Sequence, residues 1–270
     1  MPELPEVETT IRGLEPVLKG ARLSNVEARR ADLRRPFPTD LRQRMTGATV
    51  KTLHRRAKYG LIDTDRGDTM IFHLGMSGRW RVDPAELLPH DHLLIVTQAG
   101  RTLALNDPRR FGSVDLWPTD ALDRYPPFTA MGPEPLGPDL TGEYLLTALG
   151  GRRASIKLML LDQKIVAGLG NIYVCEALFL ARISPQTAAG RISLPRLERL
   201  VVAIRAVLLL AIEAGGSSLR DYVRPDGELG YFSKQFAVYG REGEPCGCGD
   251  LVQRYSEGGR STFWCPKCQR

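Results

Sequence analysis

Apolar positions follow a helical spacing at the start of the chain, a strand-like spacing up to about residue 105, and a helical spacing again in the second half. In residues 7–19, one face carries Val7, Ile11, Leu14 and Leu18, which predicts an amphipathic helix. After this helix the segments become short, apolar or β-branched, and turns of Gly, Asp and Arg separate them, as in an antiparallel sandwich. The predicted strands include Thr49–His54, Leu61–Thr64, Thr69–His73, His92–Thr97 and Thr102–Leu105. The first half is therefore expected to be mainly β-sheet.

Prolines interrupt the pattern between the two halves. Six of them lie between residues 118 and 139, where neither a regular helix nor a central strand is sustained, so this stretch is the predicted interdomain connection. Beyond it, four segments are predicted to be helices, and the last two of them have wide apolar faces. These helices are Glu143–Leu149, Ile156–Leu161, Ile172–Ala181 and Leu194–Ala214. Residues 229–270 lose this periodicity and contain a cluster of cysteines.

Composition narrows the range of partners. The 270 residues are enough for two domains, and the formal charge is +6, with 30 arginines among the 37 basic residues. Arginine suits phosphate binding, so the charge favours nucleic acid, with a merely basic surface as the alternative.

The chain is expected to be cytoplasmic. Its N-terminus is acidic where a secretory signal would be basic and then apolar. The longest apolar tract, Leu200–Ala214, is interrupted by Arg205 and is shorter than the roughly 18 residues that a membrane span requires. A buried helix is therefore predicted there, and no membrane partner is expected.

The first residues offer covalent chemistry. Removal of Met1 would leave Pro2 as a free secondary amine, with the carboxylates of Glu3 and Glu6 beside it. Such an amine can attack an electrophilic carbon and condense to an iminium, and Glu3 could move the protons that this requires. The alternative is structural, because proline and acidic residues are also ordinary signals for the first turn of a helix.

Two glycine-containing loops carry residues suited to a base stack. Residues 106–112 place Arg109 and Phe111 in a Pro/Gly loop, and residues 73–78 place Met76 between glycines. Side chains of this kind can fill the space that an extruded nucleotide leaves behind. The alternative is that Phe111 and Met76 return to the core.

Two further positions leave a structural alternative open. In residues 165–173, Gly168 and Gly170 form a turn between two apolar helical segments, with Asn171 at the start of the second. The glycines would let a phosphate approach backbone N–H groups, and Asn171 could donate to a phosphate oxygen or simply cap the helix. Lys58 is either a phosphate-directed cation or part of a solvated basic edge.

Four of the five cysteines are grouped near the end of the chain as two close pairs, which favours a metal over disulfides in a reducing compartment. Cys246, Cys248, Cys265 and Cys268 predict one structural zinc ion in a tetrahedral site. The first pair is separated by one residue instead of the usual two. A hairpin between the pairs would present Arg260 at its tip to a phosphate or substrate.

Four motifs in this order resemble the bacterial formamidopyrimidine-DNA glycosylases, and the resemblance covers essentially the whole chain. They are Pro-Glu-Leu-Pro-Glu-Val-Glu-Thr at the start, Asp-Pro-Arg-Arg-Phe-Gly in the β half, Gly-Leu-Gly-Asn-Ile-Tyr in the helical half, and Gly-Arg-Ser-Thr-Phe-Trp-Cys-Pro-Lys-Cys-Gln near the end. The resemblance implies an α+β, multidomain fold: an N-terminal β-sandwich (residues 1–127), a helix–two-turn–helix domain (128–228) and a C-terminal zinc-ribbon hairpin (229–270). It also implies a monomer that binds damaged double-stranded DNA.

The same resemblance implies base-excision repair of oxidised purines, such as 8-oxoguanine and formamidopyrimidines. Pro2 would form the Schiff base, Glu3 would protonate the leaving base, and Glu6 would lie in the active-site pocket. Lys58 and Arg260 would take part in β- and δ-elimination. The residues expected to contact DNA or to fill the gap left by the extruded nucleotide are His90, Arg109, Arg152, Asn171, Met76 and Phe111.

Two alternatives stay open at this point. An endonuclease VIII-like enzyme of the same superfamily would prefer oxidised pyrimidines, but Leu4 and the segment Leu219–Tyr231 resemble the purine-specific enzyme. A non-catalytic protein that binds damaged DNA through the same fold would be favoured if the amine of Pro2 were blocked.

Overall fold

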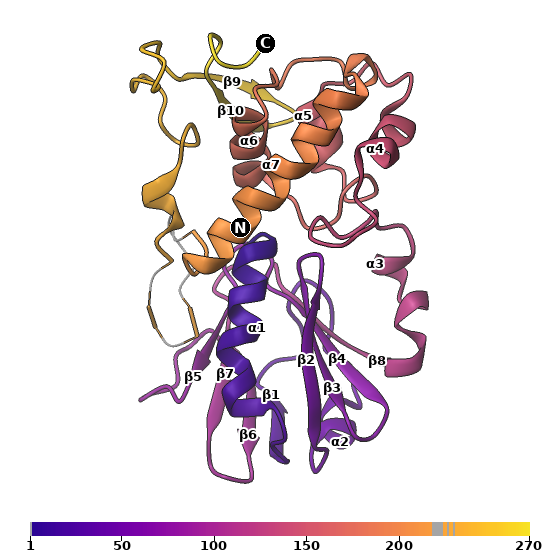
Figure 1. Cartoon of the computed structure of the whole chain (residues 1–270). Helices are drawn as coiled ribbons and strands as arrows, with labels where there is room; N and C mark the ends of the chain where they lie inside the picture. Colours follow the sequence, from indigo (N-terminus) through magenta and orange to yellow (C-terminus); the bar gives the residue numbers. More distant parts are fainter. Residues whose placement is uncertain (1, 218–223, 226, 229) are drawn as a thin grey trace. The chain divides into compact units, whose positions relative to one another are not determined.

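The structure is a computed structural model that describes residues 2–217, 224–225, 227–228 and 230–270. The chain divides into two compact units (Figure 1). Unit 1 comprises Met1–Thr129 and Ala214–Tyr231, and unit 2 comprises Ala130–Glu213 and Phe232–Arg270. The first change of unit, between residues 129 and 130, falls within the proline-rich stretch that was predicted to connect domains.

Unit 1 contains two four-stranded antiparallel sheets. The first sheet has the order β1 (Leu23–Ala28), β6 (Asp91–Thr97), β7 (Thr102–Asn106) and β5 (Arg79–Val82). The second has the order β2 (Val50–Arg56), β3 (Tyr59–Thr64), β4 (Asp68–His73) and β8 (Ser113–Pro118). Side chains of both sheets share one apolar core, so the predicted sandwich is confirmed.

Helix α1 (Leu4–Leu18) belongs to this sandwich and contacts β2, β3 and β5. Its apolar face, predicted from the helical spacing, is buried in the shared core: Val7, Ile11, Leu14 and Leu18. The helix starts before the predicted residue 7, because Glu3 and Glu6 form a reciprocal capping box at its N-terminus. The spacing of apolar residues predicted this helix correctly, and the capping residues extended it.

Short elements were the ones that the pattern did not predict. Strands β1, β5 and β8 and the helix α2 (Leu41–Met45) had no clear periodicity. In the proline-rich stretch, the structure has a 3₁₀ helix η1 (Thr119–Arg124) and the single turn α3 (Pro126–Thr129), so the expectation of no helix there is corrected. A first helical turn tolerates Pro126 and Pro127, because its N–H groups have no partner within the helix.

Unit 2 contains the predicted helices α4 (Gly142–Leu149), α5 (Ile156–Leu161), α6 (Asn171–Leu180) and α7 (Leu194–Glu213), each within one residue of its expected ends. Helix α7 packs against both α4 and α6. The 3₁₀ turn η2 (Ala189–Arg191) lies between α6 and α7, and the 3₁₀ turn η3 (Phe232–Gln235) follows α7 along the chain. The hairpin of β9 (Gln253–Glu257) and β10 (Arg260–Trp264) packs on α6. The predicted α+β, multidomain class is thus confirmed. Within the described part of the chain, no helix has the length and hydropathy to cross a membrane.

Candidate active site and metal centre

Pro2 and two acidic residues are buried at the N-terminal end of α1. The backbone N–H of Glu3 donates to Oε2 of Glu6 at 2.8 Å. The other oxygen of Glu6 accepts from the backbone N–H and the hydroxyl of Ser217, at 2.8 and 3.0 Å. The helix-start interpretation of these residues is therefore correct. Glu3 and Glu6 are nevertheless only 2% exposed and lie one and four residues after Pro2, where proton-transfer groups would be required.

Lys58 lies in a two-residue turn between β2 and β3, where Arg56 pairs with Tyr59. The preceding residue, Ala57, has φ 52°, a left-handed conformation that normally favours glycine. Lys58 is only 8% exposed, so the solvated basic edge that the sequence left open is wrong. Arg55 donates to the carbonyl of Ala57 at 2.9 Å.

Arg55 also connects this turn to the N-terminal helix, because its Nε donates to Oε2 of Glu8 at 3.2 Å. Glu8 lies in the first half of α1, close in sequence to Glu3 and Glu6. The structure thus places the start of α1 and the Lys58 turn in one region of unit 1.

His73 is a further polar residue of this region, which the sequence placed at the end of a predicted strand and the start of a loop without assigning it a role. It pairs with Tyr59 across β3 and β4, and their ring centroids are 4.7 Å apart. Its Nδ1 accepts from the N–H of Gly75 at 3.0 Å, which leaves the proton of the neutral ring on Nε2. Burial and the nearby charge of Lys58 lower the pKa of His73 to about 4. The ring is therefore a neutral hydrogen-bond donor at pH 7.

This shift predicts a dependence of stability on pH. The unfolded chain takes up a proton on His73 near pH 6.5, whereas the folded chain does so only near pH 4, so folding stability falls as the pH drops through this window. The full loss corresponds to about 3 kcal/mol. Urea unfolding measures the free energy of unfolding of the wild type and of His73→Gln at several pH values. The difference between these two free energies should change between pH 6.5 and 4 and should be constant above pH 7. A difference that is constant throughout would contradict the neutral buried ring.

Asp107 joins the two predicted base-stack loops. Its carboxylate, which is fully buried, accepts from the hydroxyl of Ser77 at 2.6 Å and from the N–H of Gly112 at 2.8 Å. The same hydroxyl accepts from the N–H of Arg109 at 3.2 Å. One side chain therefore fixes residues 73–78 against residues 106–112. The motif Asn-Asp-Pro-Arg-Arg contained this residue, but the sequence did not show that it faces inwards.

The side chains at the surface of these loops fit an intercalating role. Phe111 is 43% exposed, so the alternative that it returns to the core is wrong. The guanidinium of Arg109 lies 4.9 Å from the centre of the Phe111 ring. Gly75 packs directly on the backbone of Phe111, where a Cβ atom would lie 2.3 Å from the carbonyl carbon. Met76 is half-buried in the adjoining loop.

Two predicted DNA contacts are exposed on separate units. His90 lies on unit 1, and its carbonyl accepts from the N–H of Asp107 at 3.0 Å, which attaches it to the same loops. Arg152 lies on unit 2, in the turn between α4 and α5.

In unit 2, the β9–β10 hairpin ends in a tight turn at Gly258 and Gly259. Both glycines have positive φ, 56° and 71°, as a two-residue type I′ turn requires. Arg260 follows directly, opposite Glu257, with an exposed side chain. The hairpin predicted from the sequence therefore exists, and it presents Arg260 at its tip.

Two side chains from the helices hold this tip. The amide of Asn171 donates from Nδ2 to the carbonyl of Ser261 at 2.8 Å, and Nζ of Lys157 donates to Oγ1 of Thr262 at 2.6 Å. The N-cap of α6 is Gly170, with no side-chain cap, so the capping alternative for Asn171 is wrong. Lys157 is fully buried, and burial lowers its pKa. This role could not be predicted from the sequence, because a lysine within an apolar helix also fits a snorkelling side chain.

The four predicted metal ligands lie together. All four Sγ atoms are within 4.8 Å of one another, with Cys246 3.8 Å from Cys268 and Cys248 3.5 Å from Cys265. Thiolates at about 2.3 Å around a tetrahedral ion lie about 3.8 Å apart, so the spacing suits one metal ion. The short first pair is accommodated because Gly249, at φ 86°, turns the chain back and donates to the carbonyl of Cys246 at 2.8 Å.

The comparisons with known proteins agree with this arrangement of a sandwich, a helical unit and a cysteine-bound hairpin. Family models match residues 1–114 as the formamidopyrimidine-DNA glycosylase N-terminal domain and residues 131–223 as the formamidopyrimidine-DNA glycosylase H2TH domain. The class that the fold and the site define is therefore a DNA glycosylase of DNA repair, which binds DNA.

Named relatives agree over the full length. Formamidopyrimidine-DNA glycosylases of Rhizorhabdus wittichii and Novosphingobium aromaticivorans are 71% and 64% identical, and each match covers 100% of both chains. The crystal structure of the MutM (Fpg) protein from Thermus thermophilus is 40% identical, with a TM-score of 0.89 over 99% of this chain and 98% of that one. A Lactococcus lactis Fpg mutant in complex with DNA containing Fapy-dG is 36% identical, with a TM-score of 0.92 over 100% of each chain. The chain belongs to the formamidopyrimidine-DNA glycosylase family.

The predicted site residues fall on both units. Pro2, Glu3, Glu6, Lys58, Met76, His90, Arg109 and Phe111 lie in unit 1, and Arg152, Asn171, Arg260 and the four cysteines lie in unit 2. In the segment that resembles a purine-recognition loop, residues 219–223, 226 and 229 lie outside the described residues.

Proposed function

We propose that this glycosylase removes oxidised purines, including 8-oxoguanine and formamidopyrimidines, through a Schiff base at Pro2, and that it cleaves the resulting abasic strand by β,δ-elimination. The observation that carries this proposal is the burial of Pro2 beside two carboxylates, at a helix start that contacts the hairpin of the buried Lys58. The match of the whole chain to formamidopyrimidine-DNA glycosylases supports it.

In the first step, after removal of Met1 has freed the Pro2 amine, the lone pair of the Pro2 nitrogen attacks C1′ of the damaged nucleotide. The bond from C1′ to the base nitrogen breaks, its electron pair leaves with the base, and a proton supplied through Glu3 neutralises the leaving group. Glu6 positions this end of the helix, because it binds the Glu3 backbone and Ser217 at the same time. Opening of the sugar ring then gives the iminium.

In the second step, removal of a proton from C2′ allows the C3′–O bond to break, and a second elimination breaks the C5′–O bond. We assign Lys58 to the first elimination and Arg260 to the second. The burial of Lys58 and its charge interaction with His73 support a cation held at a fixed place, and the neutral Nε2–H of His73 suits a phosphate oxygen.

The DNA itself is held by the remaining residues. Met76, Arg109 and Phe111 fill the gap left by the extruded nucleotide, which offsets an unstacking cost of a few kcal/mol. His90, Arg109, Arg152 and Asn171 contact the backbone. The exposure of Phe111 and its rigid connection to Asp107 support this assignment.

Excision from a lesion panel tests the substrate class. Duplexes containing 8-oxoguanine, a formamidopyrimidine or an oxidised pyrimidine should be processed under single-turnover conditions, and both purine lesions should be released at least about tenfold faster. The Lactococcus lactis enzyme has been crystallised with DNA containing Fapy-dG and with DNA containing an abasic site, which supports this order. Faster release of the pyrimidine would indicate an endonuclease VIII-like enzyme. Tight binding without release would indicate a damage-binding protein.

We further propose that the metal is zinc, since four thiolates select a soft, tetrahedral ion. Bound zinc would fix the hairpin that carries Arg260 and would take no part in the chemistry. Cys265→Ser should lose about one equivalent of zinc by elemental analysis and should weaken DNA binding, because metal binding contributes to folding of this segment. The sandwich should stay folded.

Cys175→Ser is the matched control for this prediction, because Cys175 is buried in α6 and is not one of the four clustered ligands. Freshly purified protein without stoichiometric zinc, together with full activity after chelation, would contradict the zinc assignment.

We also propose that the enzyme acts as a monomer in the bacterial cytoplasm, where its cysteines stay reduced. Light scattering of the protein with and without duplex would test the monomer.

A further inference from the structure

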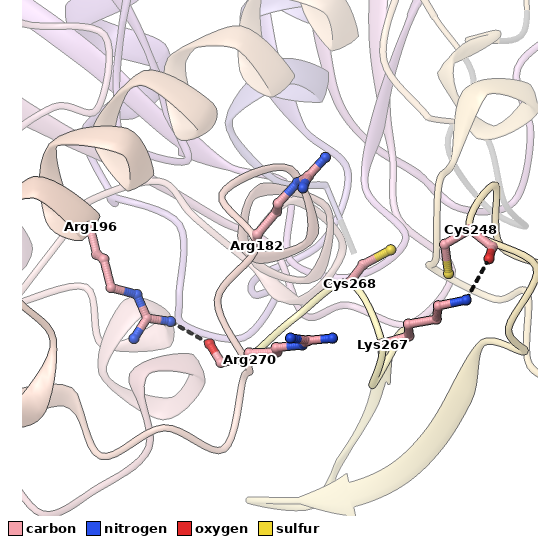
Figure 2. Close-up of a pocket in the computed structure, with 6 residues that line it drawn as sticks. All are labelled: Arg182, Arg196, Cys248, Lys267, Cys268 and Arg270. Atoms are coloured by element: carbon pink, nitrogen blue, oxygen red, sulfur yellow. Dashed lines mark hydrogen bonds between the residues drawn. The ribbon is translucent and has the colours of Figure 1, made fainter.

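A pocket of unit 2 has a marked positive charge and contains none of the residues assigned to DNA or to the reaction. Its volume is about 670 Å³, within the range of small-ligand sites (Figure 2). Its four cations come from three segments: the end of α6, the first turns of α7 and the chain after β10. The lining residues are Arg182, Arg196, Lys267, Arg270 and the thiols of Cys248 and Cys268.

Arg182 occupies a backbone position that does not favour arginine. Its φ is 56°, and the N–H of Ile183 donates to the carbonyl of Leu178 at 3.0 Å, which is the left-handed turn that usually ends a helix with glycine. A long charged side chain here costs backbone free energy that glycine would not. A role of the Arg182 side chain in the pocket would offset this cost.

The cations of the pocket lack acidic side-chain partners. No side-chain carboxylate in the described part of the chain forms an ion pair with any of the four. Instead, Arg196 donates to the main-chain oxygen of Arg270, and Nζ of Lys267 donates to the carbonyl of Cys248 at 3.0 Å, as the dashed lines in Figure 2 show. These contacts order the side chains through main-chain oxygens. A concave surface with unbalanced charge attracts an anion.

The adjoining thiols do not account for this charge by themselves. Four thiolates and a divalent ion carry a net charge of −2, which balances two of the four cations. Arg182 and Arg196 belong to the helical part of unit 2 and not to the hairpin that carries the cysteines. Arg182 supplies the surplus, because Arg196 already contacts a main-chain oxygen of residue 270, the last residue of this chain.

Two of the unit 2 residues assigned to DNA or to the reaction, Asn171 and Arg260, lie away from the pocket. Asn171 begins α6, and Arg182 follows its other end, about 15 Å away for a helix of ten residues. In the same way, Arg260 is at the tip of the hairpin, and Lys267 lies beyond its base. A DNA duplex is broad and convex, whereas this pocket is concave, with a volume of about 670 Å³. A narrow, flexible ligand therefore suits the pocket better than a duplex does.

We propose that this pocket binds an acidic peptide segment of a partner protein, with Asp or Glu carboxylates paired to the guanidinium groups of Arg182 and Arg196. Arginine forms bidentate hydrogen bonds with carboxylates, which gives orientation as well as charge. The inference is independent of the reaction assigned to Pro2, because none of its residues takes part in that reaction.

Fluorescence anisotropy with the full chain tests this site. The probe is a labelled peptide of about eight residues in which Asp alternates with Gly, and its Asn counterpart is the uncharged control. The Asp peptide should bind saturably at low salt, and the Asn peptide should not. Arg182→Glu with Arg196→Glu should weaken binding at least about tenfold, because two attractive contacts become repulsive. Excision and metal content should not change.

Two further variants make the result specific. Arg199→Glu with Arg254→Glu changes the net charge equally at exposed positions outside the pocket lining, and this variant should bind the peptide as the wild type does. Arg182→Gly places glycine at its preferred φ, so it should fold well and still lose affinity.

Four outcomes would overturn the proposal. The first is that the Asp peptide does not bind saturably. The second is that the control variant, Arg199→Glu with Arg254→Glu, loses as much affinity as the pocket variant, Arg182→Glu with Arg196→Glu. The third is that the pocket variant loses its metal, in which case the arginines serve the cysteine site. The fourth is that the pocket variant loses affinity for undamaged duplex as strongly as for the peptide, in which case the ligand is DNA.

Discussion

Extension of the processed chain, in which removal of Met1 has exposed Pro2, by one residue before Pro2 should reduce borohydride trapping on DNA with an oxidised purine to background, a loss of at least about a hundredfold. The Pro2 nitrogen would then be an amide without a basic lone pair, and the new amine would be displaced by about 3.5 Å from a buried position. The fraction of DNA trapped as a covalent complex is measured on a denaturing gel. Mass spectrometry confirms which residue is at the N-terminus of each protein.

Pro2→Gly is the appropriate comparison for the extended chain. It keeps an N-terminal amine at the same place, so partial trapping by this variant would be compatible with the mechanism. Undiminished trapping by the extended chain would contradict the mechanism, because the nucleophile would then be another group, such as Lys58. The DNA affinity of both variants should be measured, so that a loss of binding is not mistaken for a loss of chemistry.

Glu3→Gln should lower single-turnover base release by about 10²–10⁴-fold with little change in DNA affinity. The amide has nearly the same shape as the carboxylic acid, and its oxygen can still accept the N–H that Glu3 caps, so α1 should start at the same residue. The amide has no proton to transfer to the leaving base.

Glu15→Gln is a matched control on the same helix, since Glu15 forms only an exposed ion pair with Lys19 at 2.7 Å. It should release the base at the wild-type rate. A decrease below about tenfold for Glu3→Gln would count against Glu3 as the proton donor. A large decrease in both variants would indicate damage to the helix instead.

The local sequence determined most of the elements of this protein. Apolar spacing placed α1 and the helices α4 to α7, because the buried residues of each helix are close neighbours in sequence. The paired cysteines predicted a metal-binding hairpin with Arg260 at its tip. Short elements without periodicity, such as β5, could not be predicted, because sheet pairing and not local pattern makes them strands.

Only the tertiary structure decided which of these residues act together. Glu6 binds Ser217 across 211 positions, and Asn171 binds the hairpin across 90, so neither contact leaves a trace in local spacing. His73 joins Lys58 through the pairing of β3 with β4, and burial then makes its ring neutral. Periodicity reports which face of an element is buried, whereas the partner of a buried polar group depends on packing between distant segments. The sequence alone therefore determined most of the elements and their candidate chemistry, and the fold of each unit determined which of its residues meet.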